Sequence, residues 1–396
     1  MIMYILFLFT LFSTAIAAPL IVARAEDAIA GKWIVKMKGD VATLAEDDLT
    51  ASISSQPDYR YAMSGFRGFS GTLTSEELSR LQTSEHVDYI EQDARVQAST
   101  MVLQYNSSWG LSRISHKQPY EKTYLFDESA GEDTCAYVID TGIEIENPEF
   151  QGRAFFVADF SGEDTWQDLM GHGTHVAGTI GSTTWGVAKK TTLYAVRVLD
   201  QYGIGTNAGV LAGMQFVLGD APQRAAACPK GVIVNMSLGG YKTKAMNAAA
   251  AAIVSAGLFL AVAAGNDGED SIGYSPASEP SVCTVGATAF NDTFAPWSNH
   301  GPLVDILAPG VDITSTWIGG GIETLSGTSM ATPHIAGLGA YLLGLGAKAD
   351  NLCGIIAGMA TKDAIDPRTM YPNTVNLLAW NGAQGSSRYG NRRVKA

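Results

Sequence analysis

The feature that most constrains the fold is a series of short apolar runs, rich in β-branched residues, that recur beyond residue 130. They cover residues 135–140, 193–198, 231–236 and 258–263. Such runs are typical of strands buried on both faces of a parallel sheet. Helical stretches, such as the alanine-rich residues 243–256, lie between them. The alternation predicts an α/β fold with a mostly parallel sheet flanked by helices, in which ligands bind at the carboxyl ends of the strands.

A smaller α+β domain is predicted ahead of this sheet, over residues 18–101. Segments in it alternate polar and apolar residues with the period of two that half-buried strands show. Thr74 is followed three residues later by Glu77, the spacing of a capping box at the start of a helix. We expect strands at 31–37, 66–73 and 87–93, a helix within 40–55, a helix beginning at 74, and a linker at 94–108.

The first 17 residues read MIMYILFLFTLFSTAIA, an apolar block that ends in a small-x-small pattern. This pattern predicts a signal peptide at 1–17 and secretion into the extracellular space. The alternative is a short N-terminal anchor, but a spanning helix needs about 20 apolar residues and the block is shorter. The main domain is expected over 102–385, followed by a basic, disordered tail at 386–396. We expect no stable membrane association.

The composition excludes several classes of protein. Of 396 residues, 46% are hydrophobic and 16% are charged, which supports a large core and excludes a disordered chain. The net charge of -13 argues against nucleic acid or an anionic membrane as a partner. The four cysteines include no CxxC pair, so zinc or thioredoxin chemistry is not indicated. In an exported chain they suggest two disulfides, with three connectivities open.

Three segments carry the groups that nucleophilic catalysis by serine requires. A serine hydroxyl becomes a nucleophile when an imidazole accepts its proton, and a carboxylate holds that imidazole in one tautomer. Asp140, His172 and Ser329 supply these groups in the order Asp, His, Ser, which differs from the order in chymotrypsin and α/β-hydrolases. The segments read VIDTG at 138–142, GHGTH at 171–175 and SGTSMATP at 326–333.

Each of these residues alone has a structural interpretation, as a turn, a cap or a packed side chain. Three extended matches in one order favour catalysis. His172 and His175 form an alternative metal pair on a helix, but the glutamate of an HExxH motif is absent. We therefore expect no catalytic metal, and we expect His175 and His334 to be structural.

An oxyanion also needs hydrogen-bond donors. Asn266 places an amide just past the apolar run at 258–263, and the backbone N–H of Ser329 is the second expected donor.

Two other functions stay open: a hydrolase that acts on esters, and a catalytically inactive relative that binds other proteins. The absence of a GxSxG elbow argues against the first, and the intact triad argues against the second.

Beyond these catalytic residues, the chain from 109 to 382 resembles the proteinase K-type branch of the subtilisin-like (subtilase) family, close to fungal cuticle-degrading proteases. Residues 19–101 resemble the inhibitor propeptide of the same family. The resemblance implies Asp140, His172 and Ser329 as the catalytic triad and Asn266 as the oxyanion residue. Further matching segments are WGLSRI at 109–114, WGVA at 185–188, SLGG at 237–240, SPASEPSVC at 275–283 and STWIGG at 315–320.

The resemblance also implies where a peptide substrate binds. Two edges hold the substrate as an extended strand, and a primary pocket accepts the side chain before the scissile bond. The small residues of that pocket imply a preference for aromatic and aliphatic side chains. The implied edges are Gly203, Ile204, Gly205 and Ser237, Leu238, Gly239, and the implied pocket residues are Ala263, Ala264, Gly265 and Tyr274.

A structural calcium site is implied as well. Its ligands are the carbonyls of Pro280 and Val282 and the carboxylate of Asp305, and oxygen ligands of this kind suit Ca2+. Lys117 stands at a ligand position of the family's weaker calcium site, which puts that second site in doubt.

The cysteines follow the family pattern with one departure. The resemblance implies the pairs Cys135–Cys228 and Cys283–Cys353. Val176 replaces a free cysteine that often follows the catalytic histidine in the family, so no cysteine is left unpaired.

The predicted function is that of a secreted serine endopeptidase of broad specificity, which works through an acyl-enzyme. It is made as a zymogen that cleaves itself near the bond between Met101 and Val102. The expected partners are protein and peptide substrates and its own propeptide, which acts as an intramolecular inhibitor. We expect a monomer without an organic cofactor.

Overall fold

The computed structural model describes residues 17–23, 28–39, 43–95 and 101–383. The chain divides into two compact units, one ending at Ala98 and one beginning at Ser99. Residues 1–16 of the predicted signal peptide and the predicted tail at 386–396 lie outside the described residues. Within the described ranges, no helix combines the length and apolar character needed to cross a membrane.

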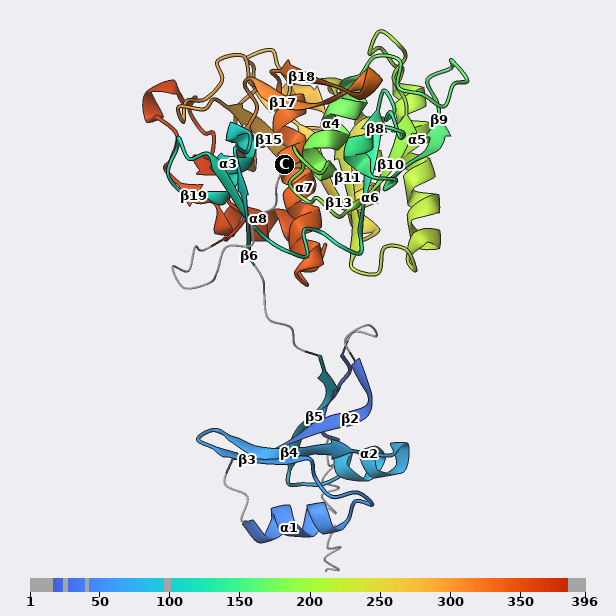
Figure 1. The fold of residues 1–396 in the computed structure, drawn as a ribbon, viewed down its shortest axis with the longest axis vertical. Helices are drawn as coiled ribbons and strands as arrows, with labels where there is room; N and C mark the ends of the chain where they lie inside the picture. The colour runs from blue at the N-terminus through green and yellow to red at the C-terminus, as the bar shows by residue number, and fades with distance from the viewer. Residues whose placement is uncertain (1–16, 24–27, 40–42, 96–100, 384–396) are drawn as a thin grey trace, which may run out of the picture. The chain divides into compact units, whose positions relative to one another are not determined.

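The described part of the N-terminal unit is a five-stranded sheet with two helices, as predicted for a small α+β domain (Figure 1). Its strand order is β1-β5-β2-β4-β3, and its core contains the fully buried side chains of Val35, Phe69 and Ile90. The predicted capping box is present, since Thr74 and Glu77 each accept a backbone N–H of the other. The elements are β1 Leu20–Ile21, β2 Ala28–Met37, α1 Thr43–Ala51, β3 Tyr59–Met63, β4 Phe66–Thr72, α2 Ser75–Gln82 and β5 Val87–Ala94.

The larger unit is built on a nine-stranded sheet in the order β19-β20-β16-β15-β13-β11-β8-β10-β9. Every neighbouring pair is parallel except β19 and β20, so the predicted mostly parallel sheet is confirmed. The strands are β8 Thr134–Asp140, β9 Ala154–Asp159, β10 Thr192–Arg197, β11 Gly231–Met236, β13 Phe259–Ala263, β15 Cys283–Thr288, β16 Ile306–Pro309, β19 Thr361–Lys362 and β20 Leu377–Leu378.

Helices cover both faces of this sheet, which explains why its strands are apolar throughout. Along β8, Tyr137 and Ile139 join one core cluster while Ala136 and Val138 join the other, as the alternation of a strand requires. The first face packs against α5 and α6, and the second packs against α4 and α7. The helices are α3 Trp109–Ser115, α4 His172–Gly181, α5 Asn207–Asp220, α6 Lys244–Ser255, α7 Thr328–Gly344 and α8 Leu352–Met359.

Three two-stranded pairs lie outside the main sheet. One of them, β6 with β7, begins at Met101 inside the stretch that the sequence predicted to be a linker. The linker prediction is therefore wrong for Met101–Tyr105, because this strand is fixed by pairing with a distant segment. The pairs are β6 Met101–Tyr105 with β7 Thr123–Asp127, β12 Gly240–Tyr241 with β14 Tyr274–Ser275, and β17 Ile313–Trp317 with β18 Gly321–Leu325.

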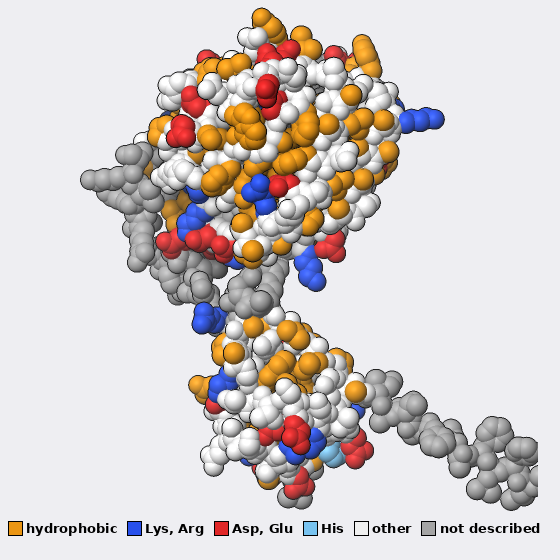
Figure 2. Space-filling view, turned by 90° about the vertical axis from the view of Figure 1, so that its right-hand side faces the viewer, with side chains coloured by type: hydrophobic (Ala, Val, Ile, Leu, Met, Phe, Trp, Pro, Cys, Tyr) orange, Lys and Arg blue, Asp and Glu red, His pale blue; other side chains and the backbone are white. Residues whose placement is uncertain are grey.

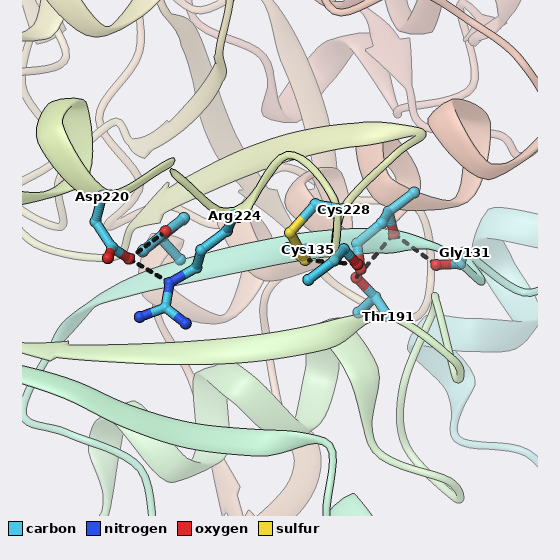
Figure 3. Close-up of a disulfide and its surroundings, with 9 residues drawn as sticks. Gly131, Cys135, Thr191, Asp220, Arg224 and Cys228 are labelled. Atoms are coloured by element: carbon cyan, nitrogen blue, oxygen red, sulfur yellow. Dashed lines mark hydrogen bonds and ion pairs between the residues drawn. A yellow bond between two sulfur atoms is a disulfide. The ribbon is translucent and has the colours of Figure 1, made fainter. Parts of the chain in front are cut away.

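Two disulfides join the sheet to its surroundings. They are Cys135–Cys228 and Cys283–Cys353, the pairs that the family resemblance implied. Figure 3 shows Cys135 near the start of β8. Next to it, the hydroxyl of Thr134 lies 2.8 Å from that of Thr191 and donates to the carbonyl of Gly131 at 2.6 Å.

On the face of the larger unit seen in Figure 2, Lys and Arg side chains lie scattered rather than gathered in a positive patch.

Candidate active site

The predicted catalytic residues come from the ends of neighbouring elements. Asp140 is the last residue of β8, and Asn266 lies three residues past the end of β13. These strands flank β11 in parallel, so their carboxyl ends meet at one edge of the sheet. His172 begins α4, and Ser329 is the second residue of α7. The prediction of a site at the carboxyl edge thus matches the positions of these elements.

Glycine is required directly before the histidine. Gly171 has a φ of 103°, a conformation that side chains with a Cβ rarely adopt. A Cβ at this position would also lie 2.6 Å from the indole of Trp317. The Gly171-His172 sequence therefore fixes the backbone from which the imidazole projects.

Asp140 and His172 form a buried pair. The Nδ1 atom of His172 lies 2.7 Å from Oδ1 of Asp140, whose side chain is fully buried. Because the carboxylate accepts, Nδ1 carries the proton and Nε2 is left as the basic nitrogen. Burial disfavours the imidazolium, but the charge and hydrogen bond of Asp140 and the charge of Asp168 outweigh it and raise the pKa of His172.

Ser329 is held against the edge that follows β11. Its Oγ donates to the carbonyl of Ser237 at 3.0 Å, and Oγ of Ser237 donates to the carbonyl of Ser329 at 2.8 Å. The backbone N–H of Ser329 lies in the first turn of α7, where N–H groups have no partner within the helix. Its hydroxyl and its N–H are thus at the start of a helix that faces the carboxyl edge.

The orientation of the Asn266 amide is fixed by its neighbour. Oδ1 of Asn266 accepts from both the backbone N–H and the hydroxyl of Thr328, each at 2.8 Å. Since Thr328 donates through its backbone, the acceptor must be the oxygen, and the two N–H groups of the amide are the remaining donors. Asn266 and Ser329 line the same cavity.

Two adjoining cavities contain the predicted binding residues. The first has a volume of about 590 Å³ and is lined by His172, Ser329, Asn266 and both predicted edges, 203–205 and 237–239. The second has a volume of about 360 Å³, and its lining includes the four predicted pocket residues Ala263, Ala264, Gly265 and Tyr274. Both cavities reach Ser329, so a chain lying along the first can place a side chain in the second.

Asp168 is a residue of the site that the sequence did not indicate. It is buried, and its Oδ1 accepts from the hydroxyl of Thr141 and from the N–H groups of Met170 and Gly171, at 2.8–3.1 Å. Its Oδ2 accepts from the N–H and the hydroxyl of Thr174, at 2.9 and 2.7 Å. One carboxylate thus ties the end of β8 to the first turn of α4. Three of its four partner residues follow it within six positions, while Thr141 lies 27 positions earlier. The link to β8 therefore depends on the fold and is not visible in the sequence.

The other two histidines of the motifs are bound elsewhere. Nε2 of His175 lies 3.0 Å from the carbonyl of Ile313, and Nδ1 of His334 lies 2.9 Å from the carbonyl of Met330. Burial lowers the pKa of each to about 4. Both are therefore neutral groups in hydrogen bonds to the backbone.

The predicted calcium residues share a third cavity. Pro280, Val282 and Asp305 all line it. Asp305 accepts the N–H of Thr284 at 2.8 Å, and burial raises its pKa to about 6 despite that bond. Among the described residues, no Lys or Arg forms an ion pair with it. A partly buried carboxylate without a paired cation fits an ion held by oxygen ligands. Lys117 is the residue that put the second calcium site in doubt. Its amino group lies 4.3 Å from the ring centre of Trp380.

The comparisons with known proteins agree with this geometry. Residues 131–362 match the profile of the subtilase family, and residues 30–99 match that of peptidase inhibitor I9. A cuticle-degrading protease of Metarhizium anisopliae is 52% identical over 370 residues, which cover 92% of this chain and 93% of the relative. Proteinase T of Parengyodontium album is 55% identical over 300 residues, covering 76% of this chain and all of the relative.

A solved structure is similar as well. The crystal structure of a cold adapted subtilisin-like serine proteinase has a TM-score of 0.65 and 38% identity, and the match covers 70% of this chain and all of that one. The chain therefore belongs to the subtilase family of serine proteases and carries an N-terminal domain of the peptidase inhibitor I9 family.

Proposed function

We propose that this chain is the zymogen of a secreted endopeptidase whose catalytic triad is Asp140, His172 and Ser329. The observation that carries the proposal is the 2.7 Å pair of His172 and Asp140 in a cavity that also contains Ser329. Two sets of donors in the same cavity, the amide of Asn266 and the N–H of Ser329, suit the oxyanion of an acyl transfer.

The proposed reaction runs in two steps. Ser329 leaves the carbonyl of Ser237, passes its proton to Nε2 of His172 and attacks the carbonyl carbon of the substrate. The imidazolium, stabilised by Asp140, then protonates the leaving amine, and an acyl-enzyme remains. Water attacks the acyl-enzyme with His172 again as base, which releases the acid and restores the serine.

The proposed substrate is an extended peptide of broad sequence. The segments 203–205 and 237–239 both line one cavity, where their backbone groups can pair with an extended chain. The proposed maturation is a self-cleavage near the bond between Met101 and Val102, which separates residues 18–101 from the enzyme.

The test uses the full-length precursor and its Ser329→Ala variant. The unchanged chain is expected to mature, to react with a fluorophosphonate at Ser329 and to digest casein. The variant is expected to stay uncut and unlabelled. Added mature enzyme should still cut the variant, which shows that its junction is accessible. Maturation of the purified variant by itself would exclude self-processing, and ester cleavage without casein digestion would favour an esterase.

We further propose one structural Ca2+ site at Pro280, Val282 and Asp305. Bound there, the ion would neutralise the partly buried carboxylate of Asp305. The Cys283–Cys353 disulfide lines the same cavity. Calcium should raise the melting temperature of the Ser329→Ala protein, and Asp305→Asn should remove that rise. An equal rise in both proteins would place the ion elsewhere.

A further inference from the structure

The primary pocket beside Ser329 has apolar walls but a charged side. Ala263, Ala264 and Gly265 line one part of it, and Leu238 lines another. Tyr274 also lines it and stacks on Tyr241, with ring centroids 5.8 Å apart. These walls suit the apolar stem of a long side chain. They do not by themselves decide what the end of that side chain meets.

Two carboxylates lie at the tyrosine side of the pocket. Asp267, which directly follows Asn266, is among the lining residues. Glu269 accepts the hydroxyl of Tyr274 at 2.8 Å. Burial, the hydrogen bond to Glu269 and the charge of Asp267 all raise the pKa of Tyr274. The phenol therefore stays neutral, and the negative charge of this region belongs to the two carboxylates.

The turn that carries these carboxylates is held in place from inside the protein. Oδ1 of Asn299, a fully buried residue, accepts the N–H groups of both Asp267 and Glu269 at 3.0 Å. Its Nδ2 donates to the carbonyl of Ala264 at 3.0 Å. One amide thus fixes the acidic turn to the pocket wall, so the position of the charges beside the pocket is part of the fold.

The charge of the pocket is not neutralised by the protein. Asp267 is the one charged residue among those that line it, and in the described part of the chain neither Asp267 nor Glu269 forms an ion pair with Lys, Arg or His. A cation brought to about 4 Å from one carboxylate gains about fivefold in affinity even at the dielectric constant of water. The gain is larger where the pocket excludes part of the solvent.

We propose that Asp267 and Glu269 extend the specificity of the primary pocket to lysine and arginine before the scissile bond. The apolar stem of such a side chain lies along the alanine wall, and its charged end reaches the carboxylates. The inference rests on the proposed protease function and names a substrate class for it. It departs from the aromatic and aliphatic preference that the family resemblance implied.

The test compares substrates that differ in charge alone. Tetrapeptide p-nitroanilides carry lysine, norleucine, arginine, citrulline or phenylalanine before the scissile bond, and the mature enzyme is assayed with each. The ratio of kcat/KM for lysine to that for norleucine is expected to be about fivefold or more at low salt. The ratio should fall as NaCl is raised, because salt screens exposed charges. This comparison of substrates uses the unchanged enzyme.

The variants then assign the effect. Asp267→Asn and Glu269→Gln should each lower the lysine to norleucine ratio about fivefold, and the ratio cancels any general loss of activity. Asp270→Asn removes the same charge from an exposed residue outside the pocket lining and should leave the ratio unchanged.

Each other outcome counts against the inference. A ratio of one or less in the unchanged enzyme, or a ratio that both pocket variants leave intact, overturns it while the cleavage of norleucine and phenylalanine substrates upholds the protease function. Failure to cleave any of the substrates, together with no labelling of Ser329, overturns both.

Discussion

The two edges of the main parallel sheet differ in what they hold. At the amino edge, Cys135 and Cys283 stand at or next to the first residues of β8 and β15 and are tied by disulfides to distant segments. At the carboxyl edge, five residues further along β8, Asp140 has an oxygen, Oδ2, without a hydrogen-bond partner among the described residues.

The difference shows at which end of the strands this fold tolerates a group that lowers the free energy of unfolding. A buried polar atom without a partner costs about 1–3 kcal/mol. The carboxyl edge carries such an atom on Asp140, beside the proposed catalytic histidine. The amino edge is instead crosslinked by the two disulfides. Changes at the two edges should therefore separate activity from stability.

The largest effect is expected from Asp140→Asn at the carboxyl edge. The amide cannot hold His172 in the tautomer with a basic Nε2, and kcat should fall by about 10⁴-fold. The free energy of unfolding, measured by denaturant in the Ser329→Ala background, should change by no more than about 1 kcal/mol. A loss of several kcal/mol in that measurement would break the separation of the two edges.

At the amino edge, the double change Cys135→Ala with Cys228→Ala should act in the opposite way. The disulfide closes a separation of 93 residues, and its loss should cost about 4 kcal/mol of stability. Because the crosslink lies at the far end of β8 from Asp140, kcat/KM at a temperature well below unfolding should stay within about twofold. Equal losses of activity and stability would contradict the comparison.

Asn266→Ala tests the oxyanion donor. Loss of one donor typically lowers kcat by about 10²–10³-fold, with KM little changed because the donor acts on charge that develops in the transition state. Thr328→Val is the matched control, since it removes the hydroxyl that donates to Oδ1 of Asn266 but keeps the amide. A smaller loss in the control is expected. A KM effect in place of the kcat effect would make Asn266 a binding residue.

The sequence predicted four strands of the larger unit, β8, β10, β11 and β13, because each of them is a local apolar run. The run at β8 is apolar on both faces, and both faces are buried by helices. The capping box of Thr74 and Glu77 was readable for the same reason, since its two hydrogen bonds lie within four residues. The family resemblance supplied the disulfide pairs, which the residues alone left open among three arrangements.

What the sequence could not give depends on contacts between distant segments. The short strand at Met101–Tyr105 lies in a stretch that is polar as a whole, and it is fixed by pairing with β7. Asp168 is one acidic residue in a loop until the fold brings Thr141, 27 residues earlier, to it. The acidic run after Asn266 is visible in the sequence, but its place at the pocket depends on Asn299, more than thirty residues away.

The smallest effect is expected from Asp168→Asn, which separates charge from packing at the carboxyl edge. His172 must be neutral to act as a base, so activity is lost as the pH falls through its pKa. Burial lowers that pKa, but the charge and hydrogen bond of Asp140 and the charge of Asp168 raise it above its usual value. His172 in turn contributes to the lowered pKa of His175. Removing the charge of Asp168 should lower the pKa of His172 and move the acid limb of the kcat/KM profile to lower pH. The nitrogen of an amide cannot accept the Thr174 N–H, so the plateau of the kcat/KM profile should also fall, by less than about tenfold.

Asp164→Asn is the matched control, because Asp164 is an exposed residue of the same loop. This change should move neither the acid limb nor the plateau of the profile. A lower plateau with an unmoved limb would show that Asp168 acts by packing alone.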